Sequence, residues 1–434
     1  MDSSDSSSLQ SNSGSVEPVK LSAREVFQTP AVKAFIIANS ALYVGLMLQA
    51  ATLGKHVYDI TGRELDIGWL GLAEFLPIAL LVFVTGSVAD RYNRRRVAVT
   101  AMVGELACAL ALVAYSLTNP TSVFPIFVIA VFYGASRAFV SPAMRSIAPM
   151  IAPENGLPQM VAMYSTVWTG AMIVGPALSG FLYAAAPWIA YATAAGLMAL
   201  GITLVSRIKL KIISDQPAKT EKPTLHSAME GLRFIKRTPI LLAAISLDLF
   251  AVLFGGAIAL LPVIAKDQLL VGDVAYGWLR AAAGIGAAST AALLAFKPIR
   301  RHVGRAMLIA VGVFGAGTIV LGLTHNYWVA FFAVMILSAG DMISVFVRGA
   351  IVPLVTPDDK RGRVSAVENV FIGATNELGA FESGAVSQLV GVKSTVVGGG
   401  IATLGIVGIF WFKFKQLRNI DTFDELSTEE STNK

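Results

Sequence analysis

Long apolar stretches separated by short polar ones run through almost the whole chain. An α-helix needs about 20 mostly apolar residues to cross a bilayer while satisfying its own backbone hydrogen bonds. Stretches of this kind fall near residues 32–54, 67–89, 97–117, 123–145, 159–183, 187–205, 241–265, 275–296, 306–324, 327–349, 364–390 and 393–412. The pattern predicts an all-α membrane protein with twelve transmembrane helices, six before and six after the polar segment 207–238.

The composition excludes several other classes of protein. Hydrophobic residues make up 55% of the 434 residues and charged residues only 14%, whereas soluble domains carry roughly 25% charge. One cysteine, Cys108, and four histidines leave no disulfide framework, and we expect no metal site and no cofactor. No phosphate-binding Gly-x-x-x-x-Gly-Lys-Ser/Thr loop is present and no catalytic set is clustered, so we expect neither an enzyme nor coupling to nucleotide hydrolysis.

Positive charge is distributed unevenly between alternate loops. With the N-terminus placed inside, 27 of the 34 Lys and Arg residues fall on the cytoplasmic side, as expected for retained positive charge. Their short clusters indicate topology rather than nucleic-acid binding. We therefore predict a multi-pass inner (plasma) membrane protein with both termini cytoplasmic. The expected parts are a disordered tail (1–30), a six-helix bundle (31–206), a linker (207–239), a second six-helix bundle (240–413) and a tail (414–434).

Short motifs recur between the two halves of the chain. The Pro-x-x-x-Pro-acid pattern of Pro149–Glu154 returns in Pro353–Asp358, and the pattern of Gly175–Gly180 returns in Gly379–Gly384, both at an offset of 204 residues. Internal repeats are common in transporters, where the substrate site lies between related halves near the bilayer midplane. The repetition predicts a duplicated six-helix unit.

The loop after the second predicted helix reads Gly-Ser-Val-Ala-Asp-Arg-Tyr-Asn-Arg-Arg-Arg from Gly86 to Arg96. It resembles the signature loop of the major facilitator superfamily, and the resemblance implies a cytoplasmic gate. The gating residues so implied are Gly86, Asp90, Arg91, Arg94 and Arg95. Asn93 stands where the family usually has glycine, so we expect a left-handed turn there. The alternative is a basic cluster that only fixes topology.

A glycine- and proline-rich run lies in the fifth predicted helix. It resembles the motif of this superfamily's antiporters and implies export, through Gly170, Gly175, Pro176 and Gly180. Small residues allow close helix packing and proline bends a helix. The alternative is an ordinary packing face.

The second half of the chain carries further motifs. They are Glu230-Gly-Leu-Arg-Phe, Asp248, Leu261-Pro-Val, Gly340-Asp341 through Arg348, Arg361-Gly-Arg-Val-Ser-Ala-Val and Glu377-Leu-Gly-Ala-Phe-Glu-Ser-Gly. Together they resemble the enterobactin exporter group of the same superfamily. The resemblance implies two pseudo-symmetric six-helix bundles, and its members include catecholate siderophore exporters and macrolide or multidrug efflux pumps.

Charged and polar residues inside the predicted helices are candidate functional groups because burying charge in a bilayer is costly. Four helices line the central cavity of this superfamily, and they carry Asn39, Arg137, Asp248, Asp341 and Arg348. We hypothesise that Asp248 or Asp341 carries the coupled proton, that Arg137 meets Asp248 across the cavity, and that Glu377 is a third candidate acid. The alternative is that these residues form structural ion pairs.

These features predict a proton-coupled exporter of an amphipathic small molecule. The expected partners are a small-molecule substrate, protons and the lipid bilayer, with no nucleic acid, and the expected oligomeric state is a monomer. Two alternatives stay open, namely a metabolite importer on the same fold and a membrane receptor or enzyme without transport.

Overall fold

The computed structural model describes residues 21–208 and 225–426, and nearly all of them are helical. Ten segments in this part of the chain are long and apolar enough to cross a membrane. They are α2 (Pro30–Thr61), α4 (Arg94–Ser116), α5 (Phe124–Ile151), α6 (Leu157–Ala185), α7 (Pro187–Arg207), the interrupted segment Pro239–Gln268, α11 (Asp273–Phe296), α12 (Val303–Leu323), α13 (Tyr327–Val355) and α15 (Val392–Lys413).

Two further helices reach spanning length. They are α3 (Glu64–Arg91) with 28 residues and α14 (Asp358–Val390) with 33 residues. In α14 the apolar character is reduced by charges in its first two turns and by three glutamates further along. With the ten, they make twelve long helices among the described residues, which agrees with the predicted fold class.

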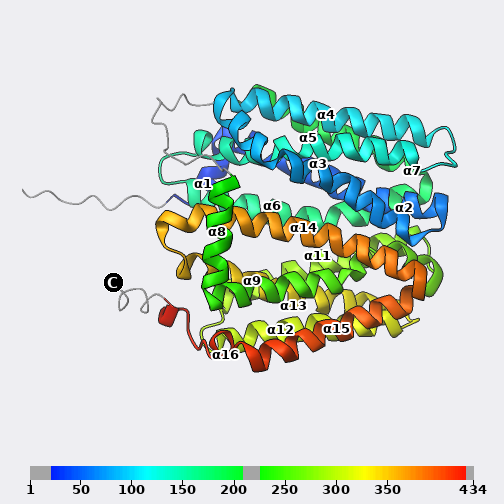
Figure 1. The fold of residues 1–434 in the computed structure, drawn as a ribbon. Helices are drawn as coiled ribbons and strands as arrows, with labels where there is room; N and C mark the ends of the chain where they lie inside the picture. Colours follow the sequence, from blue (N-terminus) through cyan, green and yellow to red (C-terminus); the bar gives the residue numbers. More distant parts are fainter. Residues whose placement is uncertain (1–20, 209–224, 427–434) are drawn as a thin grey trace, which may run out of the picture.

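The long helices form two groups that lie side by side (Figure 1). We call α2–α7 the first group and the helices from residue 239 to 413 the second group. The loops at one end of the bundle lie next to α1, α8 and α16, and we call this the terminal end. The opposite end, where α2 turns into α3, is called the distal end. Each group has its own buried apolar core, which gives the two groups separate packing centres.

The two groups meet along two helix pairs, α6 with α11 and α3 with α14. Glycines line both crossings. A Cβ on Gly180 of α6 would lie 2.8 Å from the Cα of Gly277 in α11, and a Cβ on Gly384 of α14 would lie 3.4 Å from the Cα of Gly68 in α3. The backbones therefore approach as closely as in other small-residue helix contacts in membranes.

The seventh span is not the single regular helix that its apolar run suggests. It consists of α9 (Pro239–Phe254), a 3₁₀ turn η1 (Gly256–Ile258), a short α10 (Leu261–Val263) and a π-helical turn η2 (Ile264–Gln268). Glycine is a poor helix former and the backbone at Gly256 packs closely on Gly379 of α14. Irregular backbone inside a membrane protein is tolerated where neighbouring helices bury it.

Short helices at the terminal end replace parts of the predicted tails and linker. Residues 21–30 were expected to be disordered, but they include α1 (Ala23–Gln28) with Val26 fully buried. The N–H of Ser22 donates to the carboxylate of Glu25 and lowers the pKa of Glu25. The linker contains α8 (Leu225–Arg237), and the C-terminal segment contains α16 (Lys415–Arg418). Residues 1–20, 209–224 and 427–434 lie outside the described residues.

We predict that Gly180→Val destabilises the fold because its side chain would meet the backbone of α11. A Cβ at Gly180 would lie 2.6 Å from the carbonyl oxygen of Asp273, whereas a Cβ at Gly170 of the same helix would have no neighbour within 4 Å. We expect a loss of about 1–3 kcal/mol, measured as a lower melting temperature in detergent. Gly170→Val is the matched control and should melt close to the wild type. Equal melting temperatures for both variants would contradict the close crossing.

Candidate functional site

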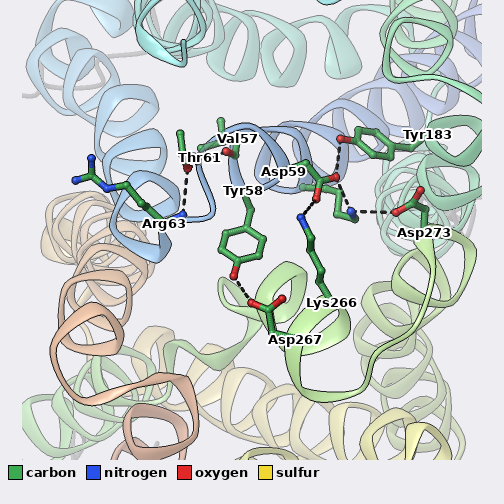
Figure 2. Close-up of polar contacts among 10 residues, drawn as sticks. Val57, Tyr58, Asp59, Thr61, Arg63, Tyr183, Lys266, Asp267 and Asp273 are labelled. Carbon is green, nitrogen blue, oxygen red and sulfur yellow. Dashed lines mark hydrogen bonds and ion pairs between the residues drawn. The ribbon is translucent and has the colours of Figure 1, made fainter. Parts of the chain in front are cut away.

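A network of lysines and aspartates joins the two groups at the distal end (Figure 2). Lys266 of η2 places its Nζ 2.8 Å from Oδ1 of Asp59 in α2. Lys55 of α2 bridges in the other direction, with its Nζ 2.5 Å from Asp59 and 3.0 Å from Asp273 of α11. Tyr183 of α6 donates a 2.9 Å hydrogen bond to Asp59. Asp59 is thus held by two cations and one hydroxyl.

Further contacts reinforce this connection. Tyr58 of α2 donates to the carboxylate of Asp267 in η2, and Tyr276 of α11 donates a 3.0 Å hydrogen bond to the carbonyl of Ala51. Tyr58 is also buried in the apolar cluster at the distal end of the second group. We call Lys55, Tyr58, Asp59, Lys266, Asp267 and Asp273 the distal lock. Its contacts hold the two groups together at this end.

A second charged cluster lies inside the second group. Arg348 of α13 forms an ion pair with Asp248 of α9 and lies 3.3 Å from Glu368 of α14. The hydroxyl of Ser344 donates a 3.3 Å hydrogen bond to Asp248. The side chains of Arg348 and Asp248 are only 5% and 8% exposed. Removal of either partner would leave the other charge buried and unpaired, which is strongly destabilising.

Asp341 lies near this cluster without joining it. It is close enough to Asp248 and Arg348 for electrostatic interaction, but no salt bridge to Asp341 is formed within the described part of the chain. A small pocket of about 10 Å³ borders the cluster. Asp248, Arg348, Thr375 and Asn376 are among the residues that line it.

Glu377 of α14 lies where the two groups cross. A Cβ built on Gly71 of α3 would lie 2.6 Å from its Oε2 atom, so this carboxylate reaches the backbone of the first group. Glu377 interacts electrostatically with Glu74, Arg137 and Arg280, which come from α3, α5 and α11. Two acids and two bases from both groups therefore share one region of the bundle.

The structure corrects one predicted contact. Arg137 was expected to meet Asp248 across a central cavity, but its closest described acid is Glu74, at 3.9 Å, within the first group. Asp248 instead pairs with Arg348, from its own group. Both arginines thus form their ion pairs within their own six-helix group.

The other predicted residues occupy varied environments. Asn39 is 1% exposed and donates to the carbonyl of Phe35 in its own helix, which places it in a packed interior. In the glycine motif, Gly175 packs against Met47 of α2 and Pro176 is buried, whereas Gly170 has open space around it. The motif thus serves close packing on two sides of α6.

Part of the predicted gating loop lies outside the described side chains. This holds for Gly86, Asp90 and Arg91, although α3 itself continues to Arg91. Arg95 at the start of α4 donates a 2.8 Å hydrogen bond to the carbonyl of Ile208, and Arg94 is half-buried beside it.

The expected left-handed turn at Asn93 is wrong. Its φ is −58°, and its side chain instead caps α4 by accepting hydrogen bonds from two backbone N–H groups. Asparagine is among the preferred residues at this capping position. The residue therefore starts the next helix rather than reversing the chain.

Aromatic residues gather between α2 and α6 in the first group. Tyr43 and Tyr164 are hydrogen-bonded through their hydroxyls, and the ring of Trp168 meets that of Tyr43 edge-on with centroids 4.9 Å apart. Trp168 remains 36% exposed. This cluster offers flat apolar surface with two hydroxyls beside it.

The distal lock was missed in the sequence. Lys55 and Lys266 stand out there only as two of the four basic residues predicted outside the cytoplasmic side. The sequence signal for it is Asp59, four residues after Lys55, since residues four apart share a helix face and can form an ion pair. The sequence did not indicate which residues of the opposite group contact Lys55 and Lys266.

A model of the family described as transmembrane secretion effector matches residues 22–433. The chain is 26% identical to the multidrug efflux pump Tap of Mycolicibacterium fortuitum over 83% of its length and 90% of the relative. It is 23% identical to the staphyloferrin A transporter of Staphylococcus aureus over 89% of its length and 97% of the relative.

A solved structure resembles the fold. It is a bacterial homologue of the human lysosomal transporter Spinster in an inward-facing, unoccupied conformation, with a TM-score of 0.68 and 16% identity. The match covers 90% of this chain and 98% of that one. At this identity the likeness concerns the fold alone.

We predict that Lys266→Gln loosens the distal lock because it removes a cation shared between the groups. The reporter is Ala51→Cys in a Cys108→Ala background, since Ala51 is fully buried beneath the lock. We expect its maleimide labelling rate to rise roughly fivefold, the effect of about 1 kcal/mol. Arg63→Gln is the control, because Arg63 pairs at 3.8 Å with Asp66 of its own group and with no acid of the other group among the described residues. Unchanged labelling in Lys266→Gln would refute a closing role for the lock.

Proposed function

The chain belongs to the transmembrane secretion effector family of major facilitator transporters, and on this premise we propose that it exports an amphipathic small molecule in exchange for protons. The family makes it a multi-pass membrane transporter and not an enzyme. Export is supported by the family description and by the efflux name of a relative that matches 83% of this chain. The staphyloferrin A transporter among its relatives supports a siderophore as one class of cargo.

We propose that the terminal end faces the cytoplasm and the distal end faces outward across the inner membrane. Most Lys and Arg residues belong to the terminal end under this orientation, as retained positive charge requires. The distal lock then closes the outer side of the transporter. Cargo would enter from the cytoplasm and leave after the lock opens.

The observation that carries the coupling mechanism is the position of Glu377 at the contact between the groups. A carboxylate that reaches Gly71 of the opposite group changes its surroundings whenever the groups move apart. Such a change alters how strongly the carboxylate holds a proton, which is the physical requirement for coupling. Arg137 and Arg280 of the two groups lie near this carboxylate, so a relative movement of the groups also changes the charge around it.

Asp341 is the second candidate for the coupled proton. Unlike Asp248, which is bound to Arg348 and Ser344, it has no ion pair among the described residues. Asp248 is better suited to hold Arg348 in place, and Glu368 shares this role. We therefore assign proton exchange to Glu377 and Asp341 and a positioning role to Asp248.

The cargo site proposed here lies along α2 and α6 near Tyr43, Tyr164 and Trp168. Aromatic rings present apolar faces, and the tyrosine hydroxyls offer hydrogen bonds to a polar group of the cargo. This combination suits an amphipathic molecule better than a sugar. Two spanning helices of the first group supply all three residues.

Site-directed labelling tests the orientation. In a Cys108→Ala background, Lys393→Cys at the distal end should react with a membrane-impermeant maleimide added to intact cells. Lys415→Cys at the terminal end should react only after the cells are permeabilised. The opposite pattern would reverse the proposed topology.

Transport in everted vesicles tests the coupling. We expect wild-type vesicles to accumulate a fluorescent cationic drug or a labelled catecholate when a proton gradient is imposed. Glu377→Gln and Asp341→Asn should each reduce gradient-driven uptake at least tenfold, because an amide cannot exchange a proton. Glu382→Gln is the matched control on the same helix, since Glu382 is only half-buried, and it should retain uptake.

Two results would contradict the proposal. Full gradient-driven uptake by both Glu377→Gln and Asp341→Asn would place the coupled proton elsewhere. Substrate loss from everted vesicles in response to the gradient, instead of accumulation, would indicate an importer.

A further inference from the structure

An aromatic pocket lies at the distal end beside the lock. It is lined from three helices, by Asp273 and Trp278 of α11 and by Tyr327, Trp328 and Phe331 of α13, with the end of α6 as the third wall. Its volume is about 800 Å³, which is within the range of sites for small molecules or headgroups. Apart from Asp273, which belongs to the distal lock, the residues named here have no role in the function proposed above.

The aromatic wall is held in place by its own contacts. Tyr327 donates a 3.1 Å hydrogen bond to the carbonyl of Ala275, which ties the start of α13 to the start of α11. The ring centroids of Tyr327 and Trp328 are 5.4 Å apart, and those of Trp328 and Phe331 are 6.2 Å apart. A group that enters the pocket therefore meets several rings whose positions are fixed relative to one another.

The distal lock contains more negative than positive charge. Its two lysines, Lys55 and Lys266, face three aspartates, Asp59, Asp267 and Asp273. The neighbouring Arg63 and Asp66 pair with each other and leave this balance unchanged. Of the two aspartates that contact Lys55, Asp273 is the more weakly held, because Lys55 lies 3.0 Å from it but 2.5 Å from Asp59.

Asp273 belongs both to the lock and to the pocket. Its side chain is 31% exposed, so one carboxylate can meet Lys55 on one side and a ligand on the other. A carboxylate together with aromatic faces is the arrangement that recognises ammonium groups, through ion pairing and cation–π attraction. The pocket is thus complementary to a cation.

The surroundings of the pocket favour a lipid over a water-soluble cation. Trp278 is 40% exposed and Trp328 is 65% exposed, as is typical of aromatic residues at the level of lipid headgroups. Leu270, just before the pocket, is 82% exposed. These apolar side chains offer contact to acyl chains next to the pocket.

We propose that this pocket binds the ammonium headgroup of a phospholipid such as phosphatidylethanolamine, with Asp273 as the ionic partner. The headgroup competes with Lys55 for Asp273 and so weakens one contact of the distal lock. Membranes rich in this lipid would then favour opening of the distal end. Under the proposed orientation the pocket lies in the outer leaflet. Binding of the lipid depends neither on the cargo nor on the direction of transport.

Fluorescence quenching by brominated lipids tests the pocket without any transport. The full chain keeps Trp328 as its only tryptophan, with the other five replaced by phenylalanine, and is reconstituted in vesicles of phosphatidylethanolamine and phosphatidylglycerol. The bromines are placed on one lipid or on the other at equal mole fraction. We expect brominated phosphatidylethanolamine to be favoured at Trp328 roughly two- to fivefold, the range of a single cation–π contact.

A tryptophan at the same end of the bundle provides the control. Trp188 of α7 is 41% exposed and does not line the pocket. A variant that keeps only Trp188 should be quenched equally by both brominated lipids. The comparison separates a pocket effect from a general enrichment of one lipid around the protein.

Two variants make the test decisive. Asp273→Asn should abolish the preference at Trp328, and Phe331→Ala, which leaves the lock intact, should reduce it. Equal quenching by both lipids in the starting protein, or a preference that survives Asp273→Asn, would overturn the proposal. Binding of tetraphenylphosphonium at Trp328 without any lipid preference would do so as well, because it would assign the pocket to cationic solutes. These quenching measurements do not require transport, so a failure of the proposed transport function would leave them unchanged.

Discussion

Placing a charge in hydrocarbon is so costly that every charged side chain inside the bundle must have compensating neighbours. This constraint explains the arrangement of the ionic groups. Arg348 is enclosed by Asp248 and Glu368, and Arg137 lies beside Glu74. Asp341 and Glu377 lie near arginines but form no ion pair among the described residues. These are the two acids to which we propose to assign proton exchange.

The two contacts between the groups have different physical characters. Along α6–α11 and α3–α14, glycines bring the backbones of the two groups into close contact. At the distal end, oppositely charged side chains of the two groups instead contact one another at 2.8 and 3.0 Å. The two groups are therefore joined by close backbone packing along the helix pairs and by ion pairs at the distal end.

Much of the fold could be predicted because transfer of apolar side chains into lipid dominates the free energy of a spanning helix. The twelve long helices follow from this property alone. The choice of partners did not follow, because hydropathy says nothing about which acid an arginine reaches. The Arg137–Asp248 contact was therefore wrong, and the cross-group partners of Lys55 and Lys266 were not found. Similarly, α1 and α8 contain too little apolar sequence to be distinguished from polar tails and linkers by this criterion.

The interruption of the seventh span makes the two groups mechanically unequal. Its counterpart α2 is one continuous helix of 32 residues, which can move as a rigid element. Between Phe254 and Gln268 the second group instead has 3₁₀ and π turns with few regular hydrogen bonds in series, and this segment carries Lys266 and Asp267. A duplicated architecture can in this way combine one continuous helix with one interrupted helix, so that bending concentrates beside the distal lock.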